Sequence, residues 1–164
     1  MTSVLNNLRL LLIAAWLGAA IFFSAAVAPA AFQVSRGFNL SNPGEVAGAL
    51  VNRTLGVINI TGFAISAFVI VLTLLLKKSF KVSSFVAQLV LLTVVAVSTA
   101  VGEWVIAARM RQLRLAMAIP IEQVATGDPM RVAFQALHGY SVAALSVAII
   151  AALIAFIFMA RRAA

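Results

Sequence analysis

The 164 residues are 64% hydrophobic and 10% charged, and the formal net charge is +8 with only four acidic residues. A soluble domain carries about 25% charged residues, so the composition excludes a water-facing surface of ordinary size and predicts an integral membrane protein. The absence of cysteine excludes disulfides, thiolate metal sites and cysteine nucleophiles. We expect no nucleic-acid partner, because aromatic residues do not interleave the basic ones.

The first apolar segment, residues 10–32, is open to two interpretations. Arg9, an apolar run and the small residues Ala26-Val27-Ala28 follow the order of a secretory signal peptide and its cleavage site. The segment is, however, longer than the usual signal-peptide core of about 7–15 residues. It also reaches the length of about 20 residues that crosses a bilayer. We therefore expect a retained membrane helix whose outer end is marked by Pro29, which can kink or stop the helix there.

Three further segments have the length and apolarity of membrane spans, namely residues 55–76, 82–106 and 132–160. Backbone polar groups in lipid must be satisfied within the segment, so the spans are predicted to be helices. The short connections between neighbours predict an antiparallel up-down arrangement. The expected fold is an all-α, integral membrane four-helix bundle forming a single domain over residues 1–164.

The starts of two helices are marked in the sequence. Asn42 before Pro43 and Asp128 before Pro129 combine a capping residue with a proline at the first helical position. The second helix is therefore predicted to begin well before residue 55. The third helix is predicted to run past the membrane, since nothing interrupts it before Pro120.

The basic residues bear on orientation but divide equally between the two ends. Lys77, Lys78, Lys81, Arg161 and Arg162 directly adjoin the spans, where positive charge favours the cytoplasm most strongly. Arg9 is counted on the same side, and the opposite side carries Arg36, Arg53, Arg109, Arg111, Arg114 and Arg131. We expect a multi-pass protein of the inner (plasma) membrane with both termini in the cytoplasm.

His138 is the single histidine and lies within the fourth apolar segment. Ionisable residues at membrane depth usually face the bundle interior, so a ligand or proton site is one interpretation. A neutral imidazole that joins two helices by a hydrogen bond is the other, and a metal or haem ligand is a third. Arg131, Gln135 and Ser141 follow at helical spacing and would form one polar stripe with His138.

Glu103 and Asn59 are further candidates for a ligand or proton site. Glu103 near the end of the third span is expected to pair with Arg53 or Arg131, or to lie solvated at the interface. Asn59 lies within the second span, where a carboxamide needs a partner. Small and polar residues at helical spacing predict packing faces between helices: Gly18, Ala26, Pro29, Gly56, Gly62, Ser66 and Ser141.

No catalytic constellation is present. The sequence has no Ser/His/Asp arrangement in a nucleophile elbow, no phosphate-binding glycine loop and no HExxH motif. We therefore expect neither an enzyme nor a bound cofactor.

Three stretches carry a resemblance: "WLGAAIFFSAAVAPAAF", "EVAGALVNRTLGVINITGF" and "FQALHGYSVAALSVA". Together they resemble the small four-helix membrane proteins of unknown function related to eukaryotic transmembrane protein 205. The recognisable positions are Phe23, Pro29, Gly48, Gly56, Leu137, His138 and Ser141. Ala144 and Leu145 stand where the family pattern has a polar residue, often Asn. The resemblance implies a membrane protein, with eukaryotic relatives associated with resistance to metal-containing drugs, and implies no reaction.

Three functions remain open at this stage. The first is a non-enzymatic component that binds a ligand, a lipid or a protein partner, as an accessory subunit or a homo-oligomer in the bilayer. The second is an oligomeric exporter of a small solute or metal species that uses His138 and Glu103. The third is a haem- or quinone-linked redox protein with His138 as an axial ligand.

Overall fold

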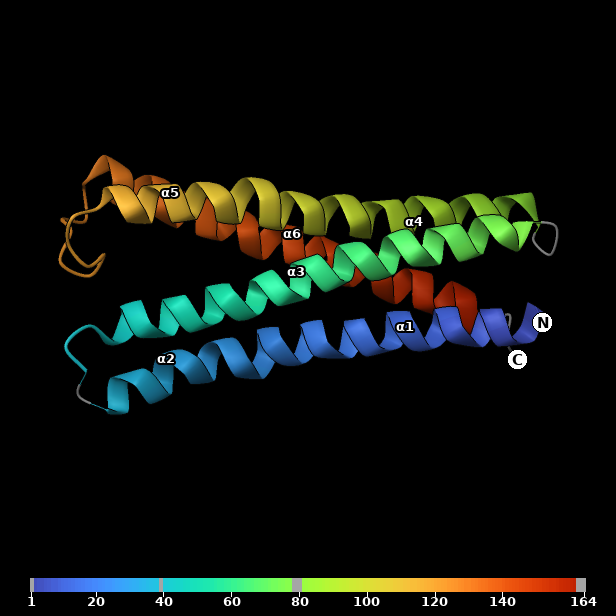
Figure 1. The fold of residues 1–164 in the computed structure, drawn as a ribbon, viewed down its shortest axis with the longest axis horizontal. Coiled ribbons are helices and arrows are strands. Elements are labelled where there is room, and N and C mark those ends of the chain that lie inside the picture. The colour runs from blue at the N-terminus through green and yellow to red at the C-terminus, as the bar shows by residue number, and fades with distance from the viewer. Residues whose placement is uncertain (1, 39, 78–80, 162–164) are drawn as a thin grey trace.

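The computed structural model describes residues 2–38, 40–77 and 81–161. Lys78 and Arg162, used above to predict orientation, lie outside these residues. The described chain forms four helices that are long and apolar enough to cross a membrane. This confirms the predicted all-α bundle (Figure 1).

Two of the four helices are interrupted by π-helical segments. The first consists of α1 (Thr2–Phe22), the π-helix η1 (Phe23–Val27) and α2 (Ala28–Gly37). The third consists of α4 (Val82–Ala100), the π-helix η3 (Val101–Ala107) and α5 (Ala108–Ala116). The second and fourth are the single helices α3 (Pro43–Leu75) and α6 (Pro129–Ala160).

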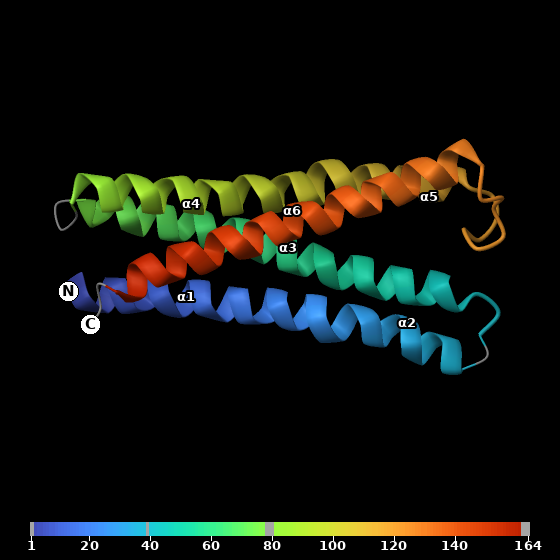
Figure 2. The same ribbon diagram turned by 180° about the vertical axis from the view of Figure 1, so that it is seen from behind.

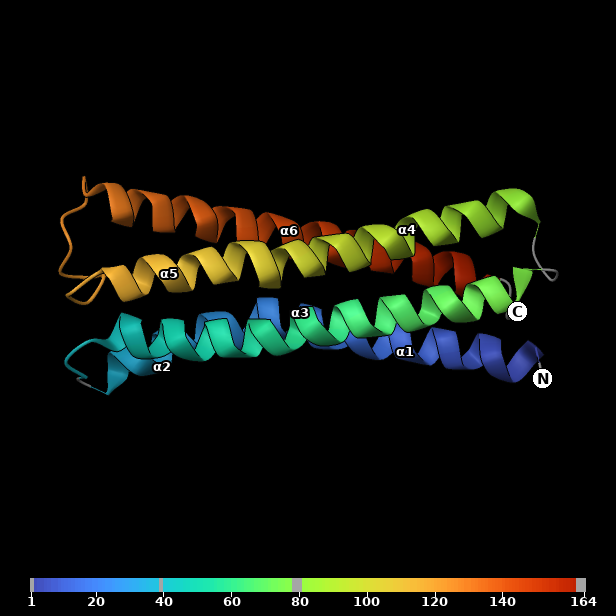
Figure 3. The same ribbon diagram turned by 45° about the horizontal axis from the view of Figure 1, so that its top comes forward.

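The helices run antiparallel between two ends of the bundle. The α2–α3 and α5–α6 connections lie at one end, called the loop end, and the start of α1 and the end of α6 lie at the other, the terminal end (Figure 1). Figure 3 shows two layers, α1 and α2 with α3, and α4 and α5 with α6. Helix α6 passes from the side of α1 at the terminal end to the side of α5 at the loop end (Figure 2).

Small side chains allow this crossing. Helix α6 buries Ala148, Ala151, Ala152 and Ala155 in the core, where they leave room for α1 and α4. Membrane helices associate through such close contacts because lipid supplies no hydrophobic drive between them.

The predicted helix starts are confirmed, with one difference. Asp128 caps α6 by accepting from the backbone N–H groups of Met130 and Arg131. Asn42 precedes α3 as predicted, but its side chain makes no cap bond. Its Oδ1 instead accepts from Nε2 of Gln123 at 3.2 Å, which ties the α5–α6 loop to the start of α3.

The prediction that Pro29 marks the end of the first helix is wrong, because α2 continues to Gly37. Proline lacks the N–H that would bond four residues back, and its ring displaces that carbonyl. The turn before it widens accordingly into η1, in which the N–H of Ala28 bonds to the carbonyl of Phe23. The π-helix thus accommodates the proline, and the helix continues beyond it.

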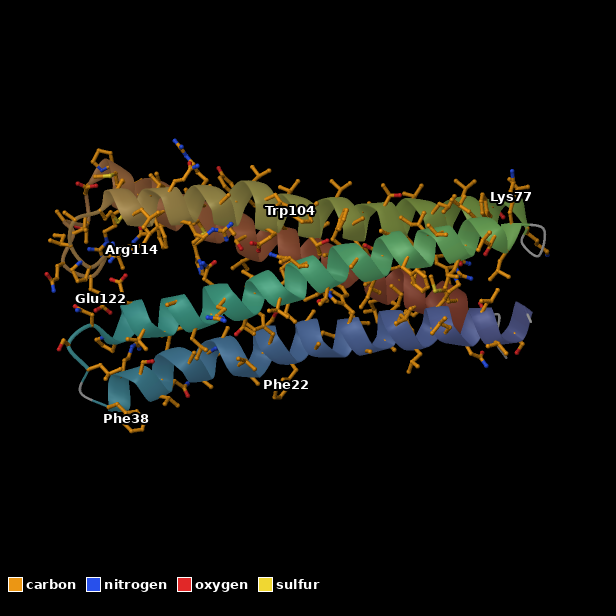
Figure 4. All side chains as sticks on the ribbon, viewed as in Figure 1. Phe22, Phe38, Lys77, Trp104, Arg114 and Glu122 are labelled. Carbon is orange, nitrogen blue, oxygen red and sulfur yellow. The ribbon has the colours of Figure 1, made fainter. Side chains whose placement is uncertain are left out.

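The helices are longer than a bilayer requires. Helix α3 has 33 residues, or about 50 Å at about 1.5 Å per residue, against about 30 Å of hydrocarbon. The uncharged segments lie toward the terminal end, so the arginine-bearing turns at the loop end extend past the apolar band. Arg114 and Glu122 lie at this loop end and Lys77 at the terminal end (Figure 4).

Candidate functional site

A groove opens on the side of the bundle between the first helix and α6. Its volume is about 290 Å³, just below the roughly 300–1,000 Å³ of small-molecule sites. The lining residues come from three helices: Phe23, Ser24, Ala28, Pro29 and Phe32 from η1 and α2, Val51 and Leu55 from α3, and His138, Ser141, Val142, Leu145 and Ser146 from α6.

The course of the helices explains why the groove lies here. Helix α2 packs on α3, whereas α6 turns away toward α5 and η3 at the loop end. The change occurs beside η1 and Pro29, which line the groove themselves. Proline and π-helical turns are common causes of a change in helix direction.

His138 lines this groove and does not face the bundle interior, contrary to the prediction. Its side chain is exposed, and no described residue forms a hydrogen bond with it. The alternative of a hydrogen bond that joins two helices therefore finds no support in the described chain. The imidazole can donate or accept a hydrogen bond from an occupant of the groove.

The predicted stripe around His138 is only partly assembled. Ser141 is buried and lines the groove with His138. Gln135 is exposed and lies outside the groove. Arg131 donates through Nη1 to the carbonyl of Val124 in the α5–α6 loop, while its Nε is buried without a partner. Arg131 therefore anchors the loop and does not line the groove.

Glu103 is buried in η3, and its predicted partners are wrong. Its Oε1 accepts from Nη1 of Arg111 at 3.1 Å, whereas Arg53 and Arg131 make no such contact. Arg111 lies eight residues further along the same helical rod, and its long side chain reaches back toward the membrane. Arg53 is exposed and forms no hydrogen bond or ion pair with any described residue.

Asn59 is buried and lies at the contact between α3 and η3, where a Cβ on Gly102 would be 3.1 Å from its Nδ2. Gly56, one turn earlier on α3, faces Glu103, and a Cβ at Gly56 would lie 3.3 Å from Oε2 of Glu103. Phe63, one turn later, packs edge-on against Trp104 with ring centroids 5.1 Å apart. Trp104 is exposed and lies about midway between the two ends (Figure 4). Glu103 and Asn59 therefore lie near the middle of the bundle's length and not at its loop end.

The remaining predicted packing residues differ in how far they are buried. Gly62 lies against Trp16, where a Cβ would be 2.7 Å from the indole ring, and Ser66 is fully buried. Ala26 lies half-buried within η1. Gly18 is exposed with no atom within 4 Å of a Cβ built on it. The prediction that Gly18 allows another helix of this chain to approach is wrong.

Two polar contacts have no counterpart in the sequence analysis. Arg9, which was counted among the basic residues that set orientation, is fully buried and donates to Oε1 of Gln88 at 2.5 Å. At the loop end, Arg114 pairs with Glu45 at 2.5 Å and joins α5 to α3. Both contacts join residues more than sixty positions apart, and helical periodicity carries no signal for such pairs.

Comparison with known proteins identifies a family. A family model described as a domain of unknown function (DUF4149) matches residues 11–118. No curated protein and no solved structure shows a significant match. The matched region contains Glu103, Asn59 and the part of the groove formed by η1, α2 and α3, and it ends before α6 and His138.

Proposed function

The chain belongs to the DUF4149 family, and we propose that this multi-pass membrane protein binds a small amphiphile in the groove between the first helix and α6. The function of the family is unknown, so membership alone assigns no activity. The protein is a binding component without a reaction of its own. The observation that carries the proposal is the imidazole of His138, which lines an otherwise largely apolar groove and has no hydrogen-bond partner among the described residues.

The lining determines how the amphiphile would lie. Phe23, Phe32 and Leu145 offer apolar surface to a hydrocarbon chain. His138 and Ser141 offer hydrogen bonds to a polar end. An unpaired polar group in lipid is costly, so a ligand that satisfies His138 gains more there than it would in water. The volume of about 290 Å³ suits one short chain or one headgroup and not a large substrate.

Photochemical labelling tests this proposal. A single-chain amphiphile with a diazirine in its chain is irradiated with the reconstituted protein, and the labelled residues are mapped by mass spectrometry. Labels are expected on Phe23–Phe32 and His138–Ser146, and unlabelled amphiphile should compete. Loss of one hydrogen bond of about 1.4 kcal/mol corresponds to about tenfold weaker binding, so His138→Ala should lower labelling by about that factor.

The control variants separate the groove from the rest of α6. Ser146→Leu places bulk in the groove and should abolish labelling, whereas Val147→Leu changes the adjacent exposed residue outside it and should not. Tyr140→Phe removes a nearby exposed hydroxyl that does not line the groove, and it should likewise leave labelling unchanged. Labels spread evenly over the lipid-facing surface of all four helices would refute a specific site.

The chain also offers a surface for a protein partner or a second copy of itself. Gly18 lies on α1 with Ala15 and Ala19, and all three are exposed. Small residues at this spacing allow close helix contact in membranes. We infer an oligomer or an accessory subunit that uses this face, and co-purification with a stoichiometric partner would identify which.

The membrane location, the family kinship and two competing functions, an exporter and a redox protein, are further proposals. Among the described residues, Lys77, Lys81 and Arg161 directly adjoin the spans at the terminal end and support the inner membrane with cytoplasmic termini. The stretches around Phe23, Gly56 and His138 support kinship with transmembrane protein 205.

The exporter function, the first of the two competing functions, is tested by flux in liposomes that contain only this protein. The redox function is tested by an absorption spectrum of the purified protein, in which the lack of a Soret band would exclude a haem-linked redox protein.

A further inference from the structure

A second groove lies at the terminal end of the bundle, where the start of α1 and the end of α6 run side by side (Figure 2). Its volume is about 420 Å³, and it is called the terminal groove. The terminal groove shares no lining residue with the groove beside His138. Its lining residues are Asn7, Leu10, Leu11 and Ala14 from α1, and Phe156 and Ala160 from α6.

The spacing of these residues makes the terminal groove a channel between two helix faces. The four residues of α1 follow one another at steps of three and four, and the two residues of α6 are four apart, so each set lies on one face of its helix. The small side chains of Ala14 and Ala160 leave space between the faces. Leu11 is 66% exposed, so the terminal groove is shallow and open along its side to the surrounding lipid.

The polarity of the terminal groove changes along the bundle axis. Asn7 and Ala160 lie toward the terminal end. Ala14 lies seven residues beyond Asn7, or about 10 Å further into the bilayer, and Phe156 lies about 6 Å deeper than Ala160. The only polar lining residue therefore stands at the outer end, and every residue further in is apolar. A membrane phospholipid has the same order of polarity, with its headgroup at the surface and its chains inward.

Two side chains at the outer end can bind a headgroup. Asn7 lines the terminal groove and is exposed, and its carboxamide bonds to no described residue. Arg161 directly follows Ala160, is exposed, and forms no side-chain hydrogen bond or ion pair with any described residue. Phosphate oxygens accept hydrogen bonds from both an amide N–H and a guanidinium, and the bond to the guanidinium is strengthened by charge.

The distribution of charge over the whole bundle favours a headgroup with net negative charge. Three carboxylates lie at the loop end and one near the middle, namely Glu45, Glu122, Asp128 and Glu103. The terminal end carries Lys77 and Lys81 as well as Arg161, and none of the four carboxylates lies there to offset them (Figure 4). Basic residues beside a bilayer attract anionic lipids. A zwitterionic headgroup gains less, because it brings its own cation to the same place.

We propose that the terminal groove binds one anionic phospholipid, with an acyl chain along Leu10, Leu11 and Phe156 and the phosphate between Asn7 and Arg161. The bound lipid joins the start of α1 to the end of α6. The argument uses no property of the groove beside His138, so the failure of either site leaves the other standing.

Photochemical labelling with two lipid probes tests the terminal groove in the full-length protein. The protein is reconstituted in phosphatidylcholine vesicles that contain a small fraction of phosphatidylglycerol or of phosphatidylcholine, each with the same diazirine-bearing chain. The anionic probe should label residues 10–14 and 156–160 in excess of the zwitterionic probe. One cation near a membrane surface strengthens the binding of anionic lipid about fivefold, so Arg161→Gln should lower this excess by about that factor.

Matched variants separate the terminal groove from a general attraction of lipid. Arg36→Gln removes the same charge from an exposed position at the loop end and should preserve the excess. Ala14→Leu fills the inner end of the terminal groove and should abolish the excess, whereas Ala64→Leu, at an exposed position of α3 outside both grooves, should not.

Three results would overturn the proposal. The first is equal labelling of residues 10–14 and 156–160 by both probes in the wild type, which would show ordinary contact with bilayer lipid. The second is an excess that Arg161→Gln leaves unchanged. The third is an excess that Arg36→Gln lowers as much as Arg161→Gln does, which would show attraction to the protein's overall charge.

Discussion

Trp16 shows how a single side chain joins two helices of this bundle. Its Nε1 donates to the carbonyl of Ile58 at 2.9 Å, and its ring lies on Gly62 of the same helix. The hydrogen bond satisfies the indole in the core, and the glycine supplies the space that the ring occupies. The α1–α3 contact therefore depends on a small residue at position 62.

Gly62→Ala should destabilise the protein because its Cβ would lie 2.7 Å from the Trp16 ring. Overpacking of this kind costs about 1–3 kcal/mol, measured as the change in unfolding free energy in mixed micelles. Gly18→Ala is the matched control on α1, where the new methyl group meets nothing within 4 Å and better helix propensity should leave stability equal or higher. Equal stability of the two variants would contradict this packing.

Arg9 and Gln88 form a polar contact inside the terminal end. Arg9 is fully buried and donates to Oε1 of Gln88 at 2.5 Å and to Oδ1 of Asn6 at 3.3 Å. A hydrogen bond to a charged group contributes about 1.5–3 kcal/mol, so Gln88→Leu should lower the unfolding free energy by that amount. Gln112→Leu, which loses an exposed bond to Arg109, should cost almost nothing.

Residue types were easier to predict from the sequence than residue partners. Asp128 caps α6 and Gly62 packs closely as predicted, because a cap and a small-residue position are local properties. The partner of Glu103 was missed because a flexible arginine side chain can reach several turns, so spacing does not select one. The burial of Arg9 was missed because the angle at which α1 meets the bundle is a tertiary property.

At the scale of elements, the first helix departs most from its prediction. Pro29 was expected to end the helix, and instead η1 accommodates it and α2 packs onto α3. Sequence periodicity assumes a constant number of residues per turn, so it cannot place a π-helix. The starts of α3 and α6, by contrast, were predicted from Pro43 and Pro129, whose fixed backbone angle suits the first turn.

Pro29→Ala should change the register of α2. The restored N–H at position 29 can bond to the carbonyl of Ala25 and convert η1 to an α-helix, which rotates α2 by about 100°, one residue of a helical turn. Ser35, now buried against α3, would then become exposed. We expect Ser35→Cys to react with a thiol reagent faster in the Pro29→Ala background.

Pro43→Ala is the control for that experiment. Pro43 occupies the first turn of α3, where no backbone donor is needed, so its removal should leave the reactivity of Ser35→Cys unchanged. An equally slow reaction in all three backgrounds would show that packing and not Pro29 holds the π-helix.

At the scale of the whole molecule, the bundle has a charged loop end and a terminal end that carries both ends of the chain. The chain has no cysteine, so single cysteines report topology without background. Ala125→Cys at the loop end should react with an impermeant thiol reagent in intact cells, and Ser83→Cys only after permeabilisation. The opposite pattern would invert the proposed orientation.

Binding of a small amphiphile in the groove beside His138 can be tested directly at the imidazole ring. The chain contains a single histidine, so the imidazole nitrogen signals of histidine-labelled protein report on this site alone. Titration with a single-chain amphiphile should shift both signals to saturation in the wild type and in Val147→Leu, and should leave them unshifted in Ser146→Leu. Imidazole signals that stay unchanged in the folded wild-type protein at saturating amphiphile would contradict the claim.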